Sequence, residues 1–61
     1  MTAEFTINNY VLGAQLKMTP VGKIIKQERI DRYHTLIQYE NLTENEVRFI
    51  EKVLSYKAKI I

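Results

Sequence analysis

The sequence predicts a small α+β domain, a single unit over residues 1–61, with an N-terminal strand or β-hairpin followed by two antiparallel helices. Three observations carry this prediction: an alternating apolar pattern near the N-terminus, a helix-start signal at Thr19-Pro20, and a capping motif at Thr43. A chain of 61 residues has room for one core. Its 46% hydrophobic and 26% charged content is ordinary for a folded domain.

The first element is a strand within residues 4–12. Phe5 and Ile7 alternate with Thr6 and Asn8, which is the period of a strand with one buried face. Residues 15–18 also alternate, and they are the predicted hairpin partner of this strand across a turn at 13–14. An isolated hairpin is marginal in water, so it must pack on helices or on another chain.

Residues 20–40 form the second predicted element, a helix. Thr19 followed by Pro20 is an N-cap residue before a proline at the first helical position. One helical face would then hold Ile30, Tyr33, His34 and Ile37. A strand is the alternative, because Tyr33, Thr35, Ile37 and Tyr39 also alternate with a period of two.

The last element is a helix from residue 44 to 58. Thr43 and Glu46 match the capping box, in which each side chain accepts a hydrogen bond from the other residue's backbone N–H. The predicted apolar face is wide, and it comprises Val47, Phe49, Ile50, Val53, Leu54, Tyr56, Ile60 and Ile61. A face this wide is more than one neighbouring element of a small domain can cover. Part of it is therefore buried either within the domain or against a second copy or a partner.

The chain offers little for catalysis. His34 is the single histidine, Asp31 lies three residues before it, and there is no cysteine. No nucleophile elbow, zinc-protease, phosphate-loop, dinucleotide or EF-hand spacing occurs. We therefore predict a non-enzymatic protein without a metal site or a small-molecule cofactor. An enzyme would need a pocket in which His34 meets two acidic groups from separate elements.

The favoured function is regulation by docking on a larger protein through an apolar, tyrosine-rich face. Four tyrosines are many for this length, and tyrosine is enriched at protein interfaces. The partner is another protein or a second copy in a homodimer. The predicted contact residues are Tyr33, Tyr39, Phe49, Tyr56 and Ile60.

DNA binding by a dimeric transcriptional regulator is the alternative function. The net charge is only +2, but the middle third of the chain holds most of the positive excess. Predicted phosphate contacts are Lys17, Lys23, Lys26, Arg29 and Arg32.

The location predicted from the sequence is the cytoplasm. Residues 1–4 lack the basic and apolar regions of a signal peptide, and no apolar run approaches the roughly 20 residues that span a bilayer. We therefore expect no membrane partner.

Overall fold

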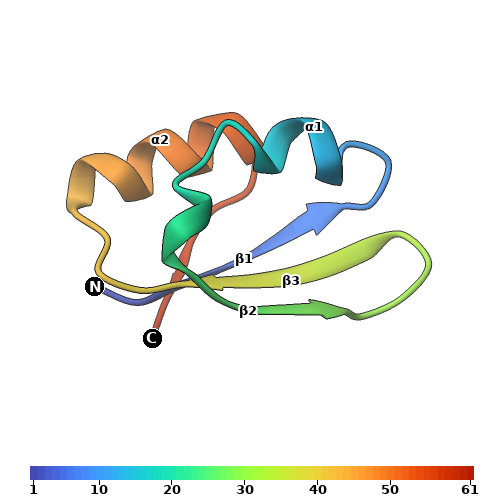
Figure 1. The fold of residues 1–61 in the computed structure, drawn as a ribbon, viewed down its shortest axis with the longest axis horizontal. Helices are drawn as coiled ribbons and strands as arrows, with labels where there is room; N and C mark the ends of the chain where they lie inside the picture. Colours follow the sequence, from blue (N-terminus) through green and yellow to red (C-terminus); the bar gives the residue numbers. More distant parts are fainter.

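The computed structural model describes residues 1–61 and shows a four-stranded antiparallel sheet with both α-helices on one face (Figure 1). The strand order is β2-β3-β1-β4. In chain order the elements are β1 (Ala3–Asn8), α1 (Leu12–Leu16), a 3₁₀ turn η1 (Val21–Lys23), β2 (Ile24–Arg29), β3 (His34–Tyr39), α2 (Glu44–Leu54) and β4 (Lys59–Ile60). This βαββαβ connectivity is the split βαβ arrangement. The α+β class is right, but the predicted hairpin followed by two antiparallel helices is wrong.

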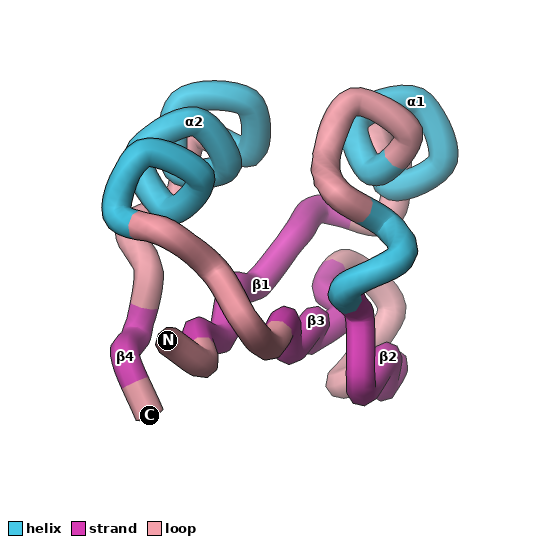
Figure 2. Tube along the Cα trace, turned by 60° about the vertical axis from the view of Figure 1, so that its left-hand side comes forward, coloured by secondary structure: helices cyan, strands magenta, loops and turns pink.

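The core lies between the sheet and the helices. Along β1 and β3 alternate residues point to the helix layer, where Phe5, Ile37 and Tyr39 are fully buried. Val47, Ile50 and Leu54 of α2 close the core from above. The rings of Phe5 and Tyr39 pack edge to face, with centroids 5.7 Å apart. The opposite face of the sheet carries no helix (Figure 2).

The predicted helix over residues 20–40 is wrong, and the strand alternative describes most of this segment. β3 lies between β1 and β2, so both of its edges are hydrogen-bonded. Thr35, Ile37 and Tyr39 are the buried set of its period-two pattern. Strand pairing on both sides supplies hydrogen-bond partners to the backbone of β3, so this segment does not need the internal bonds of a helix. Thr19-Pro20 starts only the short turn η1.

The predicted hairpin partner at residues 15–18 is also wrong, because the chain forms α1 there. The Gln15 N–H donates to the Val11 carbonyl at 2.9 Å, which closes the first helical turn. Leu12 and Leu16 are four residues apart, and both pack against the core. The predicted strand over residues 4–12 assigns Leu12 to a different element from Leu16, so the sequence pattern does not indicate their helical spacing of four.

The helix over residues 44–58 is confirmed at its start and shorter at its end. Both capping-box hydrogen bonds of Thr43 and Glu46 are present. The helix stops at Leu54 because Ser55 adopts a left-handed conformation with φ 53°. A carboxylate oxygen of Glu51 then accepts the Ala58 N–H at 2.8 Å and holds the loop that leads into β4. Ile60 therefore lies on a strand and not on the helix face.

No helix in the structure combines the length and the apolar character needed to cross a bilayer.

Candidate functional site

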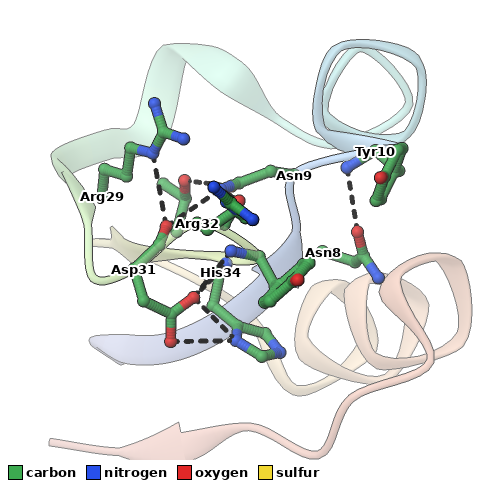
Figure 3. Close-up of polar contacts among 9 residues, drawn as sticks. Asn8, Asn9, Tyr10, Arg29, Asp31, Arg32 and His34 are labelled. Atoms are coloured by element: carbon green, nitrogen blue, oxygen red, sulfur yellow. Dashed lines mark hydrogen bonds and ion pairs between the residues drawn. The ribbon is translucent and has the colours of Figure 1, made fainter.

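The strongest candidate for a binding site is the end of the sheet where the β1–α1 loop meets the β2–β3 turn (Figure 3). Asn9 connects these two segments. Its side-chain amide donates to the carbonyl of Arg32 at 2.9 Å and to that of Asp31 at 3.3 Å. Its backbone N–H donates to the Tyr33 carbonyl at 2.8 Å. Three hydrogen bonds from one residue thus fix the loop against the turn.

The orientation of the Asn9 amide is determined by Thr35. The Thr35 hydroxyl donates to the Asn9 side-chain oxygen, so the amide nitrogen is left to face the two turn carbonyls. Thr35 is buried on the helix-covered face of β3. The clamp between loop and turn is therefore anchored in the sheet.

Asp31 organises the turn from within. One of its carboxylate oxygens accepts the backbone N–H groups of Tyr33 at 2.7 Å and His34 at 2.9 Å. The pKa of the Asp31 carboxyl lies below its usual value. The hydrogen bond from the Tyr33 N–H is the main cause, and the contact with the His34 side chain is the second. The carboxylate is thus charged and already occupied at neutral pH.

Two tyrosines and an arginine are displayed on this clamped end. Tyr10 is 86% exposed and Tyr33 is 50% exposed. Together with Asn9 and Arg32 they line a hollow of about 180 Å³. We call these four residues the tyrosine tip.

A second hollow of about 400 Å³ opens beside the edge of β1. It is lined by Thr6, Asn8, Ile30, Asp31, His34, Leu54, Ser55 and Tyr56. His34 Nδ1 lies 3.2 and 3.3 Å from the two Asp31 carboxylate oxygens. Asp31 is the only carboxylate in the lining, and it comes from the turn next to His34. The pocket therefore lacks the second acidic group, from a separate element, that the enzymatic hypothesis required.

The predicted docking residues do not form one surface. Tyr39 is fully buried, and its hydroxyl donates to the Thr19 hydroxyl at 2.8 Å. Phe49 is half exposed on α2, Tyr56 borders the second hollow, and Ile60 lies on β4. Only Tyr33 belongs to the tyrosine tip.

The five predicted phosphate-contact residues lie on different surfaces. Lys17 ends α1, and Lys23 donates to both carboxylate oxygens of Glu46 at 2.9 Å in the helix layer. Lys26 lies opposite Gln38 on the open face, whereas Arg29 lies opposite Thr35 on the helix-covered face. Arg32 is in the β2–β3 turn. The last four of these residues recur every three positions, but this spacing does not place them in one basic stripe.

Sequence reasoning missed Asn9 and Tyr10. The available signal was the Asn8-Asn9 pair directly after an alternating strand, because asparagine favours turns through its side-chain hydrogen bonds. The contacts of Asn9 reach residues 22 and 23 positions away, which no local pattern indicates.

No family model, no curated protein and no solved structure matches this chain.

Proposed function

We propose that this protein is a non-enzymatic binding module that docks on an acidic segment of a larger protein through the tyrosine tip. The observation that carries the proposal is the clamp of Asn9, which holds the loop bearing Tyr10 against the turn bearing Arg32 and Tyr33.

Residue type supports a protein partner. Tyrosine and arginine are the side chains most enriched among residues that dominate binding energy at protein interfaces. Each tyrosine ring offers a large contact area with few rotatable bonds. A surface that is already ordered before binding loses less conformational entropy when a partner arrives. The tip has this order because its backbone is held by the side chains of Asn9 and Asp31.

Charge supports an acidic partner. Arg29 ends β2 beside the turn, Arg32 lies within the turn, and Arg29 Nε donates to the Asp31 carbonyl at 3.3 Å. The carboxylate within the turn, that of Asp31, is held by His34 and by backbone N–H groups. Two arginines against one carboxylate give this turn an excess of positive charge, and complementary charge on the partner raises the association rate and specificity.

The test is a selection of random short peptides, displayed on phage, against the immobilised full chain. We expect enriched peptides to carry Asp or Glu beside an aromatic or aliphatic residue. Titration of one such synthetic peptide should shift the backbone amide signals of Asn9, Tyr10 and Tyr33 in NMR spectra. The double variant Tyr10→Ser/Tyr33→Ser should lower affinity at least about tenfold, because truncating even one residue that dominates the binding energy costs about 2 kcal/mol or more.

The matched control is Tyr56→Ser, which removes an exposed tyrosine outside the tip. It should bind the peptide as the wild type does. Absence of enrichment, or binding that the double variant leaves intact, would contradict the proposal. A parallel NMR titration with duplex DNA examines the alternative function. If DNA shifts the amide signals of the tip or of the lysines, if this binding weakens steeply with salt, and if no peptide binds, the result would favour a DNA-binding regulator.

A further inference from the structure

The outer edge of β2 is the longest unpaired strand edge in the fold. β2 is the first strand in the order β2-β3-β1-β4, and it pairs only with β3. Every residue from Ile25 to Arg29 is exposed. An exposed edge presents unpaired N–H and C=O groups to which another strand can add.

The hydrogen-bond pattern shows which backbone groups face outward. The Ile30 N–H donates to the His34 carbonyl at 3.0 Å, so the backbone of Ile30 bonds toward β3. Residues that bond toward one neighbour alternate along antiparallel strands, so Glu28 and Lys26 also bond toward β3. The N–H and C=O of Gln27 therefore point away from the sheet.

Two copies of one strand can pair about a two-fold axis, and each choice of central residue gives a different register. With Gln27 at the centre, Lys26 of each copy lies opposite Glu28 of the other. Centring on Lys26, Glu28 or Arg29 instead places like charges opposite each other, which is destabilising. Centring on Ile25 falls on the irregularity between Ile24 and Lys26 and opposes no complementary charges.

The face on which the charges lie agrees with this register. Lys26 pairs with Gln38 and Glu28 with Leu36, so both project from the open face. They already form an ion pair of 3.3 Å within one chain. In the two-fold pair each of these four charges has an opposite charge beside it along its own strand and another across the axis.

From these observations we infer that two copies of this chain associate by antiparallel pairing of their β2 strands about Gln27, which joins two sheets into one. The Gln27 residues of the two copies exchange both backbone hydrogen bonds. So short a strand contact is a small interface, and we expect a weak dimer. The tyrosine tips remain free at opposite ends.

The test is sedimentation equilibrium of the full chain from micromolar to millimolar concentration. We expect a monomer–dimer equilibrium without larger species. Gln27→Pro removes only an N–H that faces outward, a position where edge strands tolerate proline. This variant should keep the wild-type circular dichroism spectrum and remain monomeric, whereas the control Gln27→Ala should still dimerise.

Charge exchange provides a second test that does not alter the backbone. Lys26→Glu alone and Glu28→Lys alone each place like charges across the axis, and each should weaken the dimer at least about tenfold. The double variant Lys26→Glu/Glu28→Lys restores opposite charges and should recover the wild-type affinity. A wild type that stays monomeric at all concentrations overturns the inference, as does dimerisation that neither Gln27→Pro nor the single charge variants weaken. Open-ended polymers would indicate head-to-tail pairing instead.

Discussion

Tyr39 has a structural role that depends on its hydrogen bond to Thr19. Its ring is fully buried in the core, and its hydroxyl donates to the Thr19 hydroxyl, which in turn donates to the Leu16 carbonyl at 2.7 Å. Burial, only partly offset by the Thr19 bond, raises the pKa of the Tyr39 phenol. The phenol thus stays protonated and ties β3 to the segment after α1.

We expect Tyr39→Phe to lower the free energy of unfolding by about 1 kcal/mol, because a buried hydrogen bond is lost without a change in ring packing. Urea denaturation followed by circular dichroism measures this change. Tyr33→Phe is the matched control, since Tyr33 is half exposed and its hydroxyl has no hydrogen bond within the protein. Equal stability of wild type and Tyr39→Phe would show that the Thr19 bond contributes nothing.

At the scale of elements, α2 separates residues that a sequence pattern had grouped together. Phe49 and Ile50 are neighbours in sequence, and both belong to the predicted wide apolar face. The rotation of about 100° between successive helical residues buries Ile50 completely and leaves Phe49 half exposed. The wide apolar face predicted for this helix therefore includes residues, such as Phe49, that the sheet does not cover.

We expect Ile50→Ala to cost about 2–5 kcal/mol of unfolding free energy, through lost burial and the cavity left behind. Phe49→Ala should cost much less, since half of that side chain is in water in the folded state. Thermal and urea unfolding compare the two. Should the alanine variant be unfolded, Ile50→Val provides a milder change, with an expected cost of about 1 kcal/mol. Similar costs at the two positions would contradict the observed orientation of α2.

On the scale of the whole molecule, two carboxylates hold separate parts of the backbone together. Glu46 joins segments that are distant in sequence, and Asp31 closes a turn. Glu46 accepts hydrogen bonds from Lys23, which draws η1 toward the start of α2, and from the Thr43 backbone N–H. Lys23 first, and then Thr43, lower the pKa of the Glu46 carboxyl below its usual value. The Asp31 carboxyl, which organises the β2–β3 turn, has a lowered pKa as well.

These shifts predict acid destabilisation. A carboxyl whose pKa is lower in the folded state stabilises that state above its unfolded pKa of about 4, and this contribution disappears as the pH falls through the folded pKa. The urea concentration at the unfolding midpoint should therefore decrease as the pH is lowered from neutral to about 3. Asp31→Asn/Glu46→Gln should flatten this dependence, whereas Glu44→Gln, at an exposed carboxylate, should not. An unchanged pH profile in the double variant would contradict the assignment.

The sequence alone was sufficient for features that depend on neighbouring residues. The start of α2 follows from Thr43 and Glu46, which bond to each other within one helical turn. The strand β1 follows from alternation over residues 5–8. Both signals are local, so no distant partner was needed to interpret them.

Only the tertiary structure decided the middle of the chain and the candidate site. Residues 34–39 fit a helix or a strand until β1 and β2 pair with both of their edges, and β1, which covers one of these edges, lies far away in sequence. That choice buried Tyr39, dispersed the basic residues over several surfaces, and brought Asn9 to a turn 23 positions ahead. The physical reason is that a strand obtains its hydrogen bonds and its buried face from other segments, whereas a helix start obtains its bonds from itself.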